Sequence, residues 1–346
     1  MSHCVLLVRS ALVAVLLCIA VLGAACSNTS LRGAMTATPV VGGENVALAI
    51  DHTVYVQRID GTRRAIATVT GQIVYPLFPR WSPDGLTVAY VERHFFSGQA
   101  GADWGDDIYV VPVRGGAPTL IRKHGAIGQQ VEGFAWTPDG KALLLGDVRV
   151  GGDGSPFAPA SSRIVRYELS SKAETVIVEN ALEPSISADG TRIAYLASSG
   201  DKLALMTANV DGSAARELVP ADAFAVLRFP RISPDGRTVL FSAPDAVGAR
   251  LAPSSGQGWL DRVLQELGPG RAEAHGLPSY VWAVEVATGA RRKVTPQADD
   301  DPCGAWLDGG QTVAILSSTG LYRALTSGGA VQRIEEGALG GQVDAR

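Results

Sequence analysis

Apolar and polar residues alternate with a period of two along most of the chain, in short runs that end at polar turns. The stretch RWSPDGLTVAYVE, residues 80–92, is typical, because a Pro-Asp-Gly turn is followed at once by an alternating run. In such a turn Pro presets the backbone, Asp accepts hydrogen bonds from nearby amides, and Gly takes the left-handed conformation that closes a hairpin. The pattern therefore predicts pairs of antiparallel strands.

This unit recurs five times, and a second hairpin follows each copy, so each repeat predicts four strands. A sixth unit, residues 45–69, supplies only the three later strands. The turn glycines are separated by 55, 50, 46 and 74 residues, the range of a blade-sized unit plus one insertion. These glycines are Gly85, Gly140, Gly190, Gly236 and Gly310.

Four-stranded antiparallel units that repeat around an axis form a β-propeller. The incomplete first unit lacks its first strand, which either the segment from Met35 or the C-terminal GGQVDAR can supply, and we favour the C-terminal segment. An open β-solenoid is the alternative, but it would have shorter repeats. We therefore predict an all-β fold: a six-bladed β-propeller of four-stranded antiparallel blades over residues 40–346, with one short helical insertion.

The repeated W-S-P-D-G turn and the strand after it resemble the TolB-type six-bladed propeller repeat, the WD40-like PD40 repeat of bacterial lipoproteins. The resemblance covers residues 40–346. It implies the fold and says little about function, because the same repeat occurs in the translocation-associated protein TolB, in peptidase propellers and in envelope lipoproteins.

Residues 1–26 differ from the rest of the chain, with Arg9 as their only formal charge before an apolar run, and they indicate a secretion signal. The stretch VLGAACS resembles the lipobox of bacterial lipoproteins, which implies that Cys26 is lipidated. Ordinary cleavage near Ala25 is the alternative. With residues 27–39 as a linker, we expect an exported protein of the cell envelope, lipid-anchored to a membrane on its periplasmic or extracytoplasmic side.

Composition excludes several classes of protein. The 346 residues are 46% hydrophobic and 18% charged, enough for a large buried core, and 40 Gly with 19 Pro indicate many turns. The net charge of −4, without a basic run, argues against a nucleic-acid partner. If Cys26 carries lipid, Cys303 is alone in the mature chain and no disulfide forms within it.

Three long insertions, residues 93–106, 147–162 and 244–278, fall between the second and third strands of their blades, and therefore on one face of the disc. Loops on a rigid scaffold commonly carry binding, so this insertion-bearing face is the predicted site. The alternative for its aromatic residues is that they pack the loop onto its neighbour. The candidate binding residues are Arg93, His94, Phe95, Phe96, Trp104, Asp106, Trp259 and Arg262.

Residues 256–268 place apolar side chains at helical spacing, which predicts a short amphipathic helix that acts as a lid or, alternatively, docks a partner. Trp81, Trp136 and Trp306 share one repeat position, where other copies have Ile, so they are predicted to be core residues. Asp299, Asp300 and Asp301 lack the alternation of a calcium loop and are interpreted as an acidic surface loop.

Catalytic motifs are missing from the sequence: it has no G-x-S-x-G elbow and no H-E-x-x-H cluster. We therefore expect no cofactor, no metal and no catalytic residue, and a monomeric, non-catalytic binding or scaffolding propeller that contacts a protein or peptide partner. Two alternatives remain open: a propeller hydrolase or lactonase with a metal at the central opening, and a carbohydrate-binding lipoprotein.

Overall fold

The computed structural model describes residues 44–97, 103–150, 159–199, 202–245, 278–337 and 341–346, all within the compact unit 41–346. The signal segment, Cys26, the linker and the predicted helix with Trp259 and Arg262 lie outside the described residues. No helix in the described ranges is long and apolar enough to cross a membrane.

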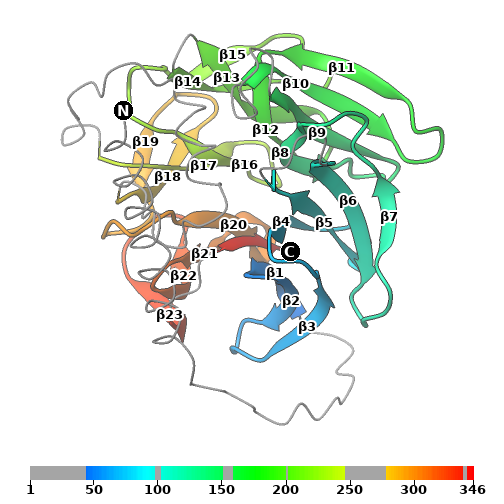
Figure 1. Cartoon of the computed structure of the whole chain (residues 1–346). Coiled ribbons are helices and arrows are strands. Elements are labelled where there is room, and N and C mark those ends of the chain that lie inside the picture. Colours follow the sequence, from blue (N-terminus) through cyan, green and yellow to red (C-terminus); the bar gives the residue numbers. More distant parts are fainter. Residues whose placement is uncertain (1–43, 98–102, 151–158, 200–201, 246–277, 338–340) are drawn as a thin grey trace, which may run out of the picture. The chain divides into compact units, whose positions relative to one another are not determined.

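The described strands form six four-stranded antiparallel sheets around a common axis, which confirms the predicted propeller (Figure 1). Blade one consists of β24 (Gly341–Ala345), β1 (Glu44–Ile50), β2 (Thr53–Arg58) and β3 (Arg63–Thr68). Blade two consists of β4 (Val74–Trp81), β5 (Thr87–His94), β6 (Gly105–Pro112) and β7 (Thr119–Arg122). Blade three consists of β8 (Gln129–Trp136), β9 (Ala142–Val150), β10 (Pro159–Glu168) and β11 (Glu174–Glu179).

The remaining blades repeat this order, with the first strand of each sheet next to the axis. Blade four consists of β12 (Ala181–Ile186), β13 (Arg192–Ser199), β14 (Lys202–Asn209) and β15 (Arg216–Val219). Blade five consists of β16 (Arg228–Ile232), β17 (Thr238–Ala243), β18 (Tyr280–Glu285) and β19 (Arg291–Lys293). Blade six consists of β20 (Cys303–Leu307), a 3₁₀ turn (Asp308–Gly310), β21 (Thr312–Ser317), β22 (Gly320–Leu325) and β23 (Val331–Glu336).

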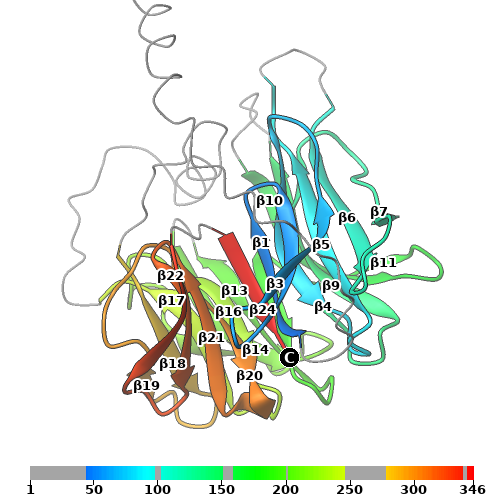
Figure 2. The ribbon, with the colours of Figure 1, turned by 90° about the horizontal axis from the view of Figure 1, so that it is seen from below.

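The C-terminal strand closes the ring. Strand β24 pairs antiparallel with β1, from Val46 opposite Ala345 to Ile50 opposite Gly341, and Figure 2 shows the two strands side by side. The prediction that the C-terminal segment supplies the missing strand of blade one is confirmed. Both ends of the propeller sequence thus belong to one sheet, which holds the ring of blades closed.

The Pro-Asp-Gly turns work as predicted. In the first, Asp84 accepts hydrogen bonds from the Ser82 hydroxyl at 2.6 Å and from the Leu86 amide at 3.0 Å, and Gly85 has a φ of +69°. The Ser82 hydrogen bond is the main reason why the pKa of Asp84 lies below its ordinary value. Equivalent turns in blades three, four and five place all these hairpins on one face of the disc, the turn-bearing face.

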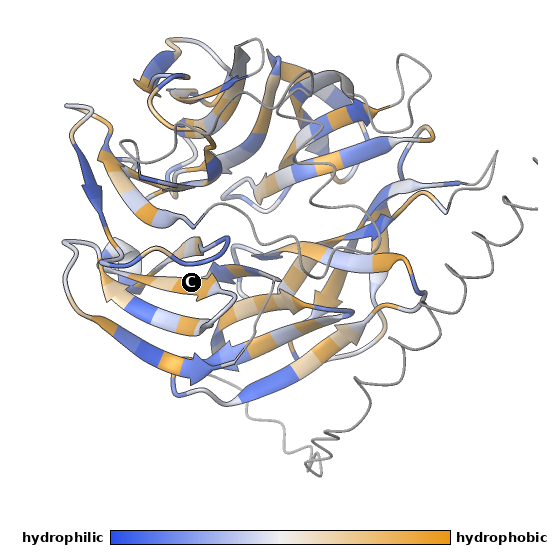
Figure 3. Cartoon of the chain, turned by 60° about the vertical axis from the view of Figure 1, so that its left-hand side comes forward, coloured by the Kyte–Doolittle hydropathy of each residue, from blue (hydrophilic) through white to orange (hydrophobic). Residues whose placement is uncertain are grey.

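The residues that share the Trp or Ile repeat position pack between neighbouring blades, as expected for core. Trp81 is 6% exposed and Ile232 is 4% exposed, while Trp136, Trp306 and Ile186 are half-buried against the hydrophobic clusters of their blades. Figure 3 shows hydrophobic and hydrophilic residues alternating along the strands, the pattern from which the sheets were predicted.

The first strands of blades two to five each contain a bulge beside the axis, where the pairing register shifts. One residue per bulge has a left-handed backbone: Phe78 (φ 50°), Gly133 (φ 76°), Glu183 (φ 51°) and Phe229 (φ 55°). A bulge re-aims the side chains around it. The channel lining therefore departs from simple alternation at these positions.

Candidate functional site

The first insertion is shorter than predicted. Strand β5 continues to His94 and β6 begins at Gly105, so that Arg93 lies opposite Asp106 within the paired strands. The assignment of Arg93, His94 and Asp106 to a loop is therefore wrong. The second insertion shrinks in the same way, because β9 extends to Val150 and β10 begins at Pro159. The sequence-based prediction was wrong here because it assigned charged residues at the ends of these strands to loops.

Arg93 is the centre of a buried ion network. Its side chain is 0% exposed and donates from Nε to Asp106 Oδ1 at 2.9 Å, from Nη2 to Asp106 Oδ2 at 2.7 Å and from Nη2 to Glu132 Oε1 at 2.8 Å. Asp106 Oδ2 also accepts from the amide of Val131 at 2.7 Å. Burial lowers the pKa of Arg93, but the charges of Asp106 and Glu132 outweigh it and raise that pKa overall. Arg93 and Asp106 thus join blades two and three and are not surface residues.

The aromatic residues of the first insertion divide into two groups. Trp104 is 5% exposed and packs with Val148 and Val150 of blade three, and the ring of Phe96 lies 5.9 Å from it. The packing alternative therefore describes Trp104, and Phe96 in part. Phe95 and Phe96 are half-buried, so both retain accessible surface.

Phe95 belongs to a row of rings that the sequence analysis missed. Its ring meets that of Tyr75 edge-on at 5.8 Å, and Tyr75 stacks on His52 at 4.5 Å. All three side chains are half-buried, and together they bridge blades one and two on the insertion-bearing face. We call these three residues the aromatic row. The three rings come from the ends of different strands, so only the tertiary structure brings them together.

His94 stands beside the aromatic row and is half-buried. Its Nε2 lies 3.2 Å from Glu92 Oε1, and this hydrogen bond is the main reason why the pKa of His94 is raised. A polar, ionisable group therefore borders the half-buried rings.

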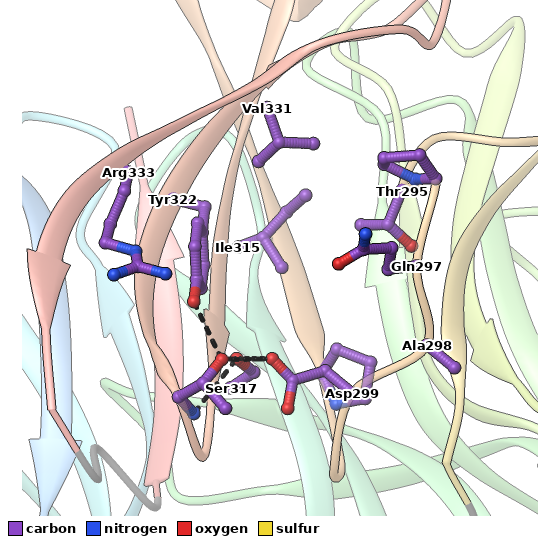
Figure 4. Close-up of a pocket in the computed structure, with 12 residues that line it drawn as sticks. Thr295, Gln297, Ala298, Asp299, Ile315, Ser317, Tyr322, Val331 and Arg333 are labelled. Atoms are coloured by element: carbon purple, nitrogen blue, oxygen red, sulfur yellow. Dashed lines mark hydrogen bonds between the residues drawn. The ribbon is translucent and has the colours of Figure 1, made fainter.

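A pocket of about 640 Å³ opens on blade six, between its sheet and the segment from Thr295 to Pro302 (Figure 4). Ile315, Val331 and Tyr322 supply its apolar wall, and Arg333 lies beside Tyr322, with its guanidinium 5.8 Å from the ring centre. Apolar walls with a few polar groups are typical of ligand pockets.

The acidic loop has structural partners at this pocket. Asp299 accepts from the Ser317 hydroxyl at 2.7 Å and from the Thr319 hydroxyl, and Thr319 in turn bonds the Tyr322 hydroxyl at 2.7 Å. Asp301 accepts from Arg228 at 2.9 Å. Within the described ranges no three His, Cys, Asp or Glu side chains are grouped so that they could hold a metal ion.

Glu183 is a buried carboxylate in the central channel. Its Oε2 accepts from the amide of Phe229 at 2.5 Å, and burial raises its pKa to about 7 despite the nearby charge of Arg228. The folded protein therefore favours the protonated form, and the free energy of unfolding falls as pH rises from 4.5 through about 7.

We expect Glu183→Gln to raise the melting temperature at about pH 8 and to leave it unchanged at about pH 4, because Gln keeps the acceptor and removes the charge. Thermal unfolding as a function of pH measures this. Glu217→Gln, an exposed change on the same blade, is the matched control. A Glu183→Gln curve parallel to that of the wild type would contradict the assignment.

No family model matches the sequence, and no curated protein matches it. Among solved structures, TolB from Acinetobacter baumannii is 15% identical with a TM-score of 0.55, over 84% of this chain and 65% of that one. A chain of a nidogen/laminin complex has a TM-score of 0.58 at 11% identity, over 87% of this chain and 98% of that one. Oligogalacturonate lyase in complex with manganese has a TM-score of 0.51 at 15% identity, over 82% and 70%.

These likenesses show the fold: the chain is a TolB-like six-bladed propeller, as the repeat indicated. It spans about 65% of the length of the TolB chain. Because the similar structures include a lyase as well as TolB, the fold by itself does not choose between a binding and a catalytic role.

Proposed function

We propose that this chain is a non-catalytic binding propeller of the bacterial cell envelope, exported and anchored through lipid on Cys26, which binds a protein or peptide partner on its insertion-bearing face. The observation that carries the proposal is the half-exposed aromatic row of His52, Tyr75 and Phe95. Exposed, mutually packed rings offer a large contact area at little conformational cost, and aromatic residues are enriched at protein interfaces.

The surroundings of the aromatic row suit a protein partner. His94 and Glu92 provide polar groups beside the rings, as at the rim of an interface. Phe96 extends the apolar surface towards Trp104, which is anchored in blade three. The rings are thus held on two rigid blades, so little order has to be gained on binding.

Two groups that could serve catalysis, His124 and Cys303, are engaged in structural contacts or buried, which favours binding over catalysis. His124 places Nδ1 2.7 Å from Asp107 and Nε2 2.8 Å from Asp103, so both ring nitrogens are occupied. The thiol of Cys303 is 2% exposed, and burial raises its pKa to about 11, which keeps it neutral and unreactive.

The test is crosslinking capture from intact cells with the full-length protein, followed by mass spectrometry. Tyr75→Ala combined with Phe95→Ala is expected to weaken partner capture by about tenfold or more, since each truncation removes an interface ring. Leu86→Ala, which changes a 65% exposed residue on the turn-bearing face, is the matched control. Undiminished capture by a double variant that unfolds like the wild type would refute this surface.

A further inference from the structure

The central channel opens on the turn-bearing face into a mouth of about 520 Å³, far from the aromatic row in the fold. All six blades contribute to it, because the first strand of each blade lies beside the axis (Figure 1), and residues of the turns that follow these strands in blades two to six also line it. Trp81, Trp136 and Trp306 line its wall, so the repeat position assigned to core also forms a surface. We call this cavity the channel mouth.

Two arginines line the channel mouth, and neither forms an ion pair with a carboxylate of the described residues. Arg80 is 5% exposed and donates only to main-chain carbonyls, to Phe134 O at 2.9 Å and Pro79 O at 2.6 Å. Arg231 is half-buried and donates to Pro230 O at 3.0 Å. Buried cations are normally paired with anions. Arg93 in the same protein follows that rule, and these two do not.

The two cations also act on each other. Burial, and after it the charge of Arg231, lowers the pKa of Arg80 to about 9. Burial likewise lowers the pKa of Arg231, against the opposing charge of Asp344. Because the surroundings of Arg80 and Arg231 disfavour their charged forms, an anion bound beside the two guanidinium groups would stabilise those forms.

Several buried side-chain donors lack an acceptor among the described residues: some, such as Arg93 Nη1 and Arg122 Nη1, lie elsewhere, and three lie at the channel mouth. Arg80 Nη2, Arg231 Nε and Trp81 Nε1 are buried and have no acceptor in the part of the chain that the structure describes, and all three residues line the channel mouth. A buried donor without an acceptor is destabilising, so three such donors around one cavity favour the binding of an acceptor. A carboxylate supplies two acceptor oxygens with several lone pairs.

Charge balance favours a singly charged ligand. Arg80, Arg231 and Asp344 are the charged side chains among the buried and half-buried residues of the mouth, and they leave one positive charge. Glu183 lies near both arginines but is largely protonated below its pKa of about 7, and Cys303 is neutral. The guanidinium of Arg346, which is exposed, lies 4.6 Å from the centre of the Trp81 ring at the rim of the mouth.

We propose that the channel mouth binds the carboxylate of an apolar or aromatic monocarboxylic ligand between Arg80 and Arg231, with its apolar part against the indoles of Trp81, Trp136 and Trp306. The ligand is either a small organic acid or the free C-terminus of a peptide, since both present the same group. This site is independent of the partner surface on the opposite face.

Binding of benzoate to the full-length protein at about pH 6, followed by calorimetry and thermal unfolding, tests the proposal. Benzoate is expected to bind saturably and to raise the melting temperature, whereas the neutral analogue benzamide does neither. Arg231→Met is expected to weaken benzoate binding by about ten- to a hundredfold, because it removes one charged donor. Arg237→Met, an exposed turn residue of the same blade, is the control.

A second readout separates a ligand site from a structural role. Without ligand, Arg231→Met should be at least as stable as the wild type, since Arg80 no longer faces a second cation.

An N-acetylated tripeptide with a free carboxylate that binds more tightly than benzoate, and loses affinity on amidation, would identify a peptide C-terminus. The reverse order would identify a small acid.

Three results would overturn the proposal. The first is an equal response to benzoate in wild type and Arg231→Met, which means a general anion effect. The second is the absence of any response in the folded wild type. The third is saturable binding of inorganic phosphate but not of benzoate.

Discussion

Removal of residues 341–346 is expected to lower the free energy of unfolding by at least about 5 kcal/mol and to make the propeller ring open at blade one. The deletion removes β24, one of the two partner strands of β1, with backbone hydrogen bonds worth about 1 kcal/mol each. It also removes Val343, which is 1% exposed and whose burial contributes about 2 kcal/mol. The total free energy of unfolding of a domain is about 5–15 kcal/mol, so the deletion is expected to remove a large part of it.

Urea unfolding and hydrogen exchange measure the effect of this deletion. Amides of residues 46–50 that face β24 should lose their protection first, while those of blade four keep theirs. Arg346→Ala, which shortens an exposed side chain and leaves β24 intact, is the control. Wild-type protection of residues 46–50 in the truncated protein would show that β24 does not close the ring.

Arg93→Met is expected to destabilise the protein by about 3–5 kcal/mol, the usual cost of breaking a buried ion pair from one side. The change leaves Asp106 and Glu132, 0% and 4% exposed, without their shared cation. Burial already raises the pKa of Glu132, and its protonation in the variant relieves the repulsion from Asp106, so the loss should be smaller at about pH 4 than at about pH 8. Chemical unfolding at both pH values measures it.

The matched control for Arg93→Met is Arg323→Met, because Arg323 also bonds an aspartate, Asp308, but at the surface, with side chains 37% and 43% exposed. Exposed pairs contribute about 0–1 kcal/mol. If Arg93→Met were no more harmful than Arg323→Met, the buried network would not be a structural link between blades two and three.

Local chemistry explains how much of the fold could be predicted from the sequence. A Pro-Asp-Gly turn is completed by residues within five positions of each other, as in the bond from Ser82 Oγ to Thr87 O at 3.0 Å. Such contacts between near neighbours can be predicted from the sequence. The alternation of apolar and polar residues in the strands and the missing strand of blade one can be predicted in the same way. The sixfold architecture followed from them.

The candidate site was predicted less well, because alternation reports burial within one sheet and not the packing between sheets. Arg93 and Asp106 were assigned to a loop since charged residues are rarely buried, yet Glu132, 39 positions further along the chain, completes their network. His52 and Tyr75 gave no signal of their own. Their contact with Phe95 exists only once blades one and two are side by side.

The sequence by itself determined the hairpins, the blade count and the insertion-bearing face, because these depend on near neighbours in the chain. The tertiary structure alone decided which charges are paired and which are not. Arg93 pairs with carboxylates from two strands, whereas Arg80 and Arg231 donate to main-chain carbonyls, with Asp344 as a nearby opposing charge. The physical reason is that the electrostatic energy of a buried charge depends on its distance from charged groups of other blades. No local sequence pattern predicts the distances between side chains of different blades.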